Sequence, residues 1–249
     1  MFTRHLPESE ARLGPGDTFP FSCHSGLACF NTCCRNKQLP LTPYDVLRLK
    51  QGLNLSSDAF LEAHTLYWTD PETGFPSVCL RMGEGPDRAC PFVSPEGCRV
   101  YDDRPTACRL YPLARAAGGQ SGSRTPGSFA YLMDTPGCLG RGEQRVWSVE
   151  AWMESQGLDP YLRMNDRMLE RVFHPNRRAR APLDERQVRT LIVACYNLDV
   201  FREFVFETPF ADAAGLSEAA RERVAVDDTA LLELGMAYLR QVLYAGEAG

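Results

Sequence analysis

The 249-residue sequence contains no run of about 18 uninterrupted apolar residues, so no segment is predicted to span a membrane. It opens with Met-Phe-Thr-Arg-His-Leu-Pro-Glu-Ser-Glu, where acidic residues and a proline replace the apolar core of a secretory signal. We therefore expect a cytoplasmic protein, whose thiols stay reduced. The net charge of −5 also argues against the broadly basic surface of proteins that bind nucleic acid.

The sequence also lacks the common catalytic motifs. It has no phosphate-binding Walker loop, no dinucleotide-binding glycine motif, no zinc-protease helix motif and no nucleophile elbow. Lysine is nearly absent, since Lys37 and Lys50 are the only two, which leaves little room for Schiff-base chemistry. Any nucleophile would be a cysteine, so catalytic residues stay unassigned and the question of enzymatic activity stays open.

Cysteine is the residue type that is present in unusual number. Hydrophobic residues make up 44% and charged residues 24%, as in ordinary globular proteins, but ten cysteines are many for an intracellular chain. Nine of them precede Arg141 and only Cys195 follows it. A Gly/Ser-rich stretch over residues 116–128, predicted to be an exposed loop, lies just before this change. We therefore predict a cysteine-cluster domain over residues 1–141 and a separate region over residues 142–249.

The first region is predicted to contain short elements between turns. Thr42-Pro43-Tyr44-Asp45 predicts a helix start, with a threonine cap and proline at the first helical position. Further helices are expected after Ser56 or Ser57 and, as a single turn carrying Cys108, after Pro105. Strands are predicted over Ser77–Met82, Arg99–Tyr101 and Phe129–Met133.

The second region has a helical period. Helices are predicted over Glu143–Gln156, Pro160–Phe173 and Glu185–Glu207, with two more between Ser217 and Tyr244. The predicted fold class is α+β: an irregular, metal-stapled N-terminal domain with short helices and strands, followed by an α-helical C-terminal part.

Seven cysteines fall into two groups with short internal spacings. The groups are Cys23, Cys29, Cys33 and Cys34, then Cys90, Cys98 and Cys108. Metal sites need several soft ligands brought together by tight turns, and glycines and prolines lie among these cysteines. The adjacent Cys33 and Cys34 are hard to join to each other, which disfavours a disulfide framework. All seven are therefore predicted metal ligands.

Other residues favour structural interpretations. Cys195 lies on an apolar helix stripe and is predicted to be a small buried residue, and the same interpretation is favoured for Cys79 and Cys138. His24 is the one histidine inside the motif and is a weaker ligand candidate; His5, His64 and His174 are weaker still. Asp102 and Asp103 favour a turn. Four arginines are expected either to offset thiolate charge or to form surface ion pairs: Arg35, Arg99, Arg104 and Arg109.

On these residues the chain resembles the CxxCxxCC, or YkgJ-type, cysteine-cluster family over about residues 20–115. The landmarks are Phe21 with Cys23, the Cys29–Cys34 run, Leu41–Asp45, Cys90–Phe92, Gly97–Tyr101, Arg104–Pro105 and Cys108–Pro112. The resemblance implies a zinc- or iron-chelating protein, or one with an iron–sulfur cluster. The family is named for cysteines separated by two residues, but here five residues separate Cys23 from Cys29 and three separate Cys29 from Cys33. The ligands of proteins with the two-residue spacing therefore cannot be carried over directly to this chain.

Several metals and roles stay open. Four thiolates suit one zinc ion or one 4Fe–4S cluster, and a bare iron site is also open. The missing two-residue spacing favours the cluster, with redox or electron transfer as its role. One alternative is a structural zinc-binding module that recognises an unknown protein partner. The other is an S-adenosylmethionine-dependent protein lysine N-methylase, because flagellin lysine N-methylases carry a related cysteine motif. In each case the metal is expected to supply folding free energy to the first region.

Overall fold

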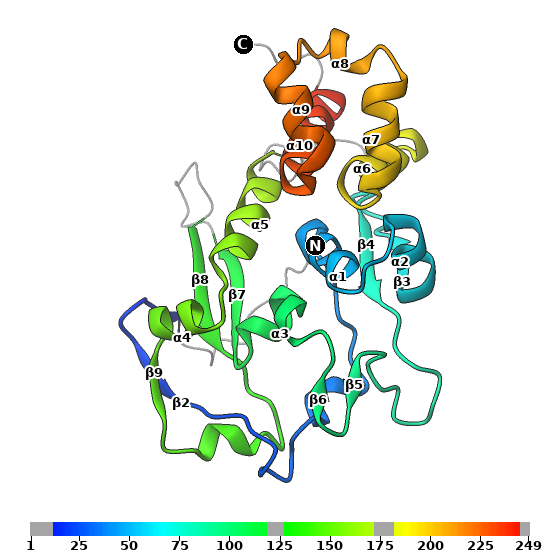
Figure 1. The fold of residues 1–249 in the computed structure, drawn as a ribbon. Helices are drawn as coiled ribbons and strands as arrows, with labels where there is room; N and C mark the ends of the chain where they lie inside the picture. The colour runs from blue at the N-terminus through cyan, green and yellow to red at the C-terminus, as the bar shows by residue number, and fades with distance from the viewer. Residues whose placement is uncertain (1–11, 119–126, 172–181, 245–249) are drawn as a thin grey trace. The chain divides into compact units, whose positions relative to one another are not determined.

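Short strands separated by loops occupy the N-terminal part of the chain and helices dominate the C-terminal part, which confirms the predicted α+β class (Figure 1). The computed structural model describes residues 12–118, 127–171 and 182–244. Its contacts divide the chain into two compact units whose segments alternate in sequence. The first unit comprises residues 1–37, 82–101 and 106–160; the second comprises residues 38–81, 102–105 and 161–249. The boundary at residue 141 stays a prediction.

The first unit is built on antiparallel strand pairs. One sheet has the order β1 (Arg12–Leu13), β8 (Gly127–Leu132), β7 (Leu113–Gly118). Two smaller pairs join β2 (Thr18–Pro20) to β9 (Val146–Ser148) and β5 (Val93–Ser94) to β6 (Gly97–Cys98). The helical elements are η1 (Thr32–Cys34), α3 (Thr106–Leu110), η3 (Leu139–Gly142) and α4 (Val149–Ser155).

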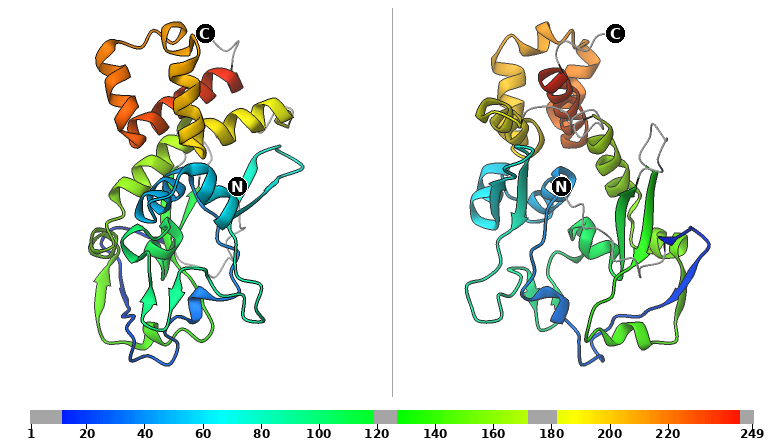
Figure 2. Two further views of the ribbon diagram at one scale, coloured as in Figure 1. Left: turned by 45° about the vertical axis from the view of Figure 1, so that its right-hand side comes forward. Right: turned by 180° about the vertical axis from the view of Figure 1, so that it is seen from behind.

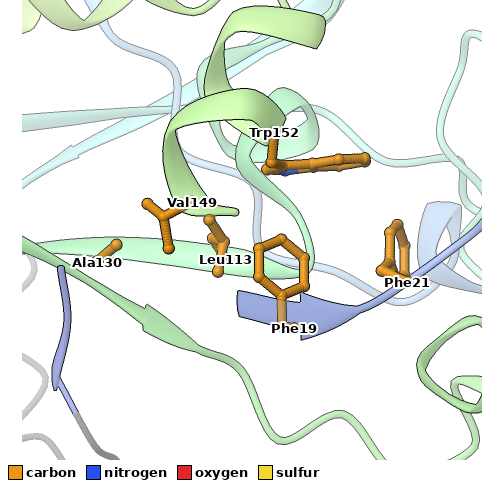
Figure 3. Close-up of a cluster of buried hydrophobic side chains, with 6 residues drawn as sticks. All are labelled: Phe19, Phe21, Leu113, Ala130, Val149 and Trp152. Carbon is orange, nitrogen blue, oxygen red and sulfur yellow. The ribbon is translucent and has the colours of Figure 1, made fainter. Parts of the chain in front are cut away.

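The core of the first unit lies where α4 faces strands β2 and β7 (Figure 3). The rings of Phe19 and Phe21 meet the indole of Trp152 edge-on, with centroid distances of 6.2 and 5.3 Å. The buried indole N–H donates to the carbonyl oxygen of Leu110 at 3.0 Å, so this polar atom is satisfied. Apolar packing therefore stabilises the part of the unit formed by these strands and α4.

The second unit is mainly helical (Figure 2). Near its start, α1 (Pro43–Gly52) and α2 (Ser57–His64) precede a hairpin of β3 (Thr65–Thr69) and β4 (Pro76–Leu80). The later helices are α5 (Asp159–Arg171, in this unit from Tyr161), α6 (Glu185–Cys195), α7 (Leu198–Glu207), α8 (Phe210–Ala213), α9 (Glu218–Val226) and α10 (Asp228–Tyr244). Within the described ranges, none of the helices combines the length and apolarity needed to cross a bilayer.

Several predicted elements are confirmed. Helix α1 begins at the expected capping box, in which the Thr42 hydroxyl accepts from the Asp45 N–H and the Asp45 carboxylate accepts from the Thr42 N–H. Ser56 caps α2, and α3 carries Cys108. Strands β4 and β8 match two of the three predicted strands, and α9 and α10 are the two last helices.

Other expectations were wrong. No strand forms at Arg99–Tyr101, because the chain turns there into a 3-10 helix over Tyr101–Asp103, η2. The helix expected from Glu143 begins only at Val149, since β9 pairs with β2 first and Ser148 then caps α4. The long Glu185–Glu207 helix is two helices, because Asn197 breaks the run and caps α7. Some predicted features lie outside the described residues: His5, most of the 116–128 loop, residues 172–173 and His174.

Helix packing in the second unit depends on Gly235. A Cβ atom on this residue of α10 would lie 1.9 Å from the carbonyl oxygen of Ala194 in α6. An exposed helical Gly→Ala change stabilises by about 1 kcal/mol, but here we expect Gly235→Ala to destabilise the unit by about 3 kcal/mol through overpacking. Urea denaturation followed by helical circular dichroism measures this. Gly16→Ala, with no atom within 4 Å of the new Cβ, should be near neutral; equal stability of the two variants contradicts the close approach.

Candidate metal centre

The cysteines divide into two classes by location and burial. All seven predicted ligands and Cys138 belong to the first unit, and all eight are exposed or half-buried thiols. Cys79 and Cys195 belong to the second unit and are 3% and 0% exposed, which confirms their prediction as small buried residues. All ten are free, so the disulfide alternative does not form in this structure.

A tight turn positions the adjacent cysteines. Cys33 and Cys34 end the 3-10 helix η1, and Asn31 and Asn36 on either side adopt left-handed backbone angles, φ 65° and 47°, which asparagine tolerates better than most residues. The Asn31 side-chain amide donates to the Ser94 carbonyl oxygen at 2.9 Å, which fastens this turn to β5 (Figure 1). Because a 3-10 helix has about three residues per turn, neighbouring side chains leave it in different directions.

The first group forms around Cys23. Burial raises the pKa of the Cys23 thiol to about 11, and the negative charges of Cys33 and Cys29 add to this. The Cys29 sulfur also accepts a hydrogen bond from the backbone N–H of Leu139 at 3.3 Å. Cys23, Cys29 and Cys33 are therefore close enough for their charges to interact.

The second group lies beside Cys34 of the first group. The backbone N–H of Cys90 donates to the Cys34 carbonyl oxygen at 2.8 Å, and Cys98 sits in β6 opposite Val93. A hydrogen bond with Cys33 raises the pKa of Cys34, followed by burial and by the charges of Cys33, Cys90 and Cys108. Burial raises the pKa of Cys90, and Cys98 contributes. The two separated stretches of sequence thus meet here.

The donor chemistry fits a soft metal. Burial and the charges of neighbouring thiols raise the pKa of Cys23, and a hydrogen bond with Cys33 raises the pKa of Cys34, whereas the same hydrogen bond lowers the pKa of Cys33 to about 6. A bound metal deprotonates the thiols that coordinate it. Among the residues that the structure describes, no three His, Cys, Asp or Glu side chains are arranged to hold an ion as they stand. Metal binding therefore requires the sulfur atoms to draw together, which partly exposed thiols on short loops permit.

The other sequence candidates have different partners. The ring of His24 accepts the Gly26 N–H at Nδ1, 3.2 Å, and its Nε2 lies 3.5 Å from the Glu143 carboxylate. Arg35 pairs with Asp87, and Arg109 donates to the Gln156 carbonyl oxygen at 2.6 Å.

Arg99, Asp103 and Arg104 also have partners or surroundings that the structure describes. Arg99 bonds the Pro91 carbonyl oxygen while its charge also acts on Cys90. Asp103 ends the 3-10 helix η2 and accepts a hydrogen bond from Arg48 at 3.0 Å. Arg104 is buried in the second unit.

Comparison with known proteins supports a metal-binding role. The CxxCxxCC family model, described as a "putative zinc- or iron-chelating domain", matches residues 22–131. This match confirms the predicted resemblance and supports metal binding in general terms. No curated protein and no solved structure shows significant similarity to the chain.

Proposed function

From the match of residues 22–131 to the CxxCxxCC domain, we propose that the protein binds metal through its clustered cysteine thiolates and that the metal is iron in an iron–sulfur cluster. The observation that carries this proposal is the near absence of apolar burial in the loops that bear the cysteines. Residues 22–37 include no buried residue, and residues 82–101 include only Phe92 and Val100. Something other than a hydrophobic core must hold these loops in place, and metal–thiolate bonds supply that free energy.

The spacing of the cysteines favours an iron–sulfur cluster over zinc. Cysteine thiolates bind both, but the paired two-residue spacing typical of zinc fingers is missing. The N–H to sulfur hydrogen bond from Leu139 to Cys29 is of the kind that tunes cluster potentials. The exposure of Cys23, Cys33 and Cys108 supports a centre that a redox partner can reach, and electron transfer is the role we propose for it.

Anaerobic purification of the full chain tests this proposal. We expect a brown protein that contains iron and acid-labile sulfide and is bleached reversibly by dithionite. Cys34→Ala should lose iron, while Cys195→Ala, which removes a buried thiol of the second unit, should keep the full amount. A colourless protein with stoichiometric zinc would overturn the cluster but not thiolate binding; a protein that takes up neither metal would overturn both.

A further inference from the structure

Strand β3 is the open edge of its hairpin in the second unit (Figure 1). Its neighbour β4 is paired on both sides, because on the side away from β3 the N–H of Leu41 donates to the Val78 carbonyl oxygen at 2.8 Å. On the outer side of β3, no strand within the described ranges is paired with it. The backbone groups on that side are therefore available to a further strand.

The hydrogen bonds of the hairpin show which groups of β3 point outward. Where the ladder meets the turn, the Asp70 N–H donates to the Phe75 carbonyl oxygen at 2.9 Å. Bonded pairs alternate with non-bonded pairs along antiparallel strands, so the N–H and C=O groups of Tyr67 and Thr69 point away from β4. The residue opposite Thr69 is Pro76, which has no N–H to offer, and this agrees with a non-bonded pair at that position.

The side chains of β3 are apolar and exposed. Leu66, Tyr67 and Trp68 are 46%, 64% and 42% exposed, whereas Val78 and Cys79, which lie opposite the first two in β4, are buried. The strand contains no charged residue and no proline, and its register has no bulge. These are the devices by which natural proteins protect a strand edge from pairing. Three consecutive large apolar side chains at an unprotected edge indicate an interaction surface.

The sequence of β3 complements itself when it is reversed. Thr-Leu-Tyr-Trp-Thr has the same order of residue types from either end: threonine, large apolar, tyrosine, large apolar, threonine. An antiparallel pair of copies centred on Tyr67 places the two tyrosines opposite each other and Leu66 opposite Trp68, pairings that stabilise a sheet. The outward N–H and C=O of each Tyr67 then bond those of the other. The Thr69 N–H of each copy also meets the Thr65 carbonyl oxygen of its partner.

The charges that adjoin this edge are complementary in the same arrangement. At the start of β3, the guanidinium of the exposed Arg81 donates to the Thr65 carbonyl oxygen at 2.8 Å. The turn after β3 carries Asp70 and the exposed Glu72, whose N–H bonds the Asp70 carboxylate at 3.0 Å. Antiparallel pairing brings Arg81 of each copy toward the acidic turn of the other. Parallel pairing would bring arginine to arginine and acid to acid, so the charges favour the antiparallel arrangement.

We propose that β3 is the interface of a homodimer, in which two copies of the chain pair antiparallel across this edge with Tyr67 on the twofold axis. The two hairpins then form one four-stranded sheet. A second copy is the occupant because the strand complements itself both in side-chain type and in the charges at its ends. The assembly is closed at two copies, since each copy uses the same edge. It needs no metal and goes beyond the proposed function.

Sedimentation equilibrium of the full chain tests the proposal, under reducing conditions that exclude disulfides between its free cysteines. With rising concentration, we expect the apparent mass to increase from that of a monomer toward that of a dimer. Tyr67→Lys sets like charges opposite each other and should weaken dimerisation at least about tenfold. Thr69→Pro removes an N–H that the hairpin itself does not use and should have the same effect. The matched control is Val226→Lys, at an 86% exposed apolar residue of the same unit, which should dimerise like wild type.

Amide hydrogen exchange of the wild-type chain separates the outcomes without any substitution. We expect the amides of Tyr67 and Thr69 to exchange at least about tenfold more slowly at dimer-forming concentration than in the dilute monomer. A monomer at every concentration, with fast exchange of these amides, would overturn the proposal and leave the edge to a different protein. Slow exchange in a monomer would also overturn it, because another segment of the same chain would then cover β3. A dimer that persists in folded Tyr67→Lys and Thr69→Pro would place the interface elsewhere.

Discussion

Removal of the metal is expected to unfold the cysteine loops while most of the molecule keeps its structure. Residues 22–37 and 82–101 have almost no buried side chains, so without metal–thiolate bonds their amides should exchange at least about tenfold faster. The strands β7 and β8 and helix α4 pack around Trp152 and should keep their protection. Hydrogen exchange with mass spectrometry, before and after anaerobic chelation, measures this segment by segment.

The second unit is the internal control for this experiment. Its cysteines, Cys79 and Cys195, are buried in apolar surroundings, so α6 and α10 should exchange equally with and without metal. Unchanged protection of residues 22–37 after complete metal removal would show that the loops fold without ligation. Equal loss of protection in both units would show that the metal stabilises the whole chain rather than the loops.

Replacement of Lys50 should have the largest effect on the second unit. Its ammonium, on a residue only 6% exposed, lies 3.2 Å from carboxylate oxygens of both Asp199 and Asp228. Asp199 also accepts the Ser57 N–H at 2.6 Å, and Arg202 pairs with Asp228. Lys50→Met leaves two carboxylates around one remaining cation, and we expect a loss of about 3 kcal/mol in the free energy of unfolding. Urea denaturation at neutral pH measures it.

The acid dependence of this loss follows from the two carboxyl groups. Burial favours a higher pKa for Asp228, but the hydrogen bond from Arg202 and the charge of Lys50 hold this pKa below its usual value. Burial also opposes ionisation of Asp199, but the hydrogen bond from the Ser57 N–H and the charge of Lys50 lower its pKa. Their contribution is therefore complete above the unfolded-state pKa, about 4, and is lost as the pH falls through the lowered folded-state value. The difference between wild type and Lys50→Met should shrink in acid.

An exposed ion pair is the matched comparison. Arg223 is 64% exposed in its side chain and lies 3.6 Å from Asp227 one turn along the chain. Arg223→Gln should change stability by less than about 0.5 kcal/mol. A Lys50→Met variant as stable as Arg223→Gln would show that water screens the Lys50 pair as fully as a surface pair.

Local chemistry made part of the fold predictable. The cap at Thr42 and the serine before α2 act within a few residues, so the sequence is enough to place those helix starts. The cysteines could be grouped for the same reason, since short spacings confine them to neighbouring turns. The wrong helix start before α4 has the opposite cause: residues 146–148 form a strand because β2, more than a hundred residues earlier, offers a pairing edge.

Long-range packing also hid the environment of Cys138. Nothing around Pro136-Gly137-Cys138 distinguishes a ligand from a small buried residue. The two residues after Cys138 make contacts with a distant part of the chain: Leu139 donates its N–H to the Cys29 sulfur, and the Gly140 carbonyl oxygen accepts the Ser22 N–H. No pattern within one segment reports such contacts. The one available signal was its position in the half of the chain that carries the other clustered cysteines.

The core around Trp152 has a consequence for how this domain can be transplanted. Phe19, Phe21, Val149 and Trp152 all lie outside the segment that matches the family, yet they pack into the same apolar cluster as Leu113 and Ala130. A chimera that contains only residues 22–131 would lose part of this cluster and expose the apolar side chains that remain. A transplanted domain should therefore also include strand β2 and helix α4, which complete the hydrophobic core.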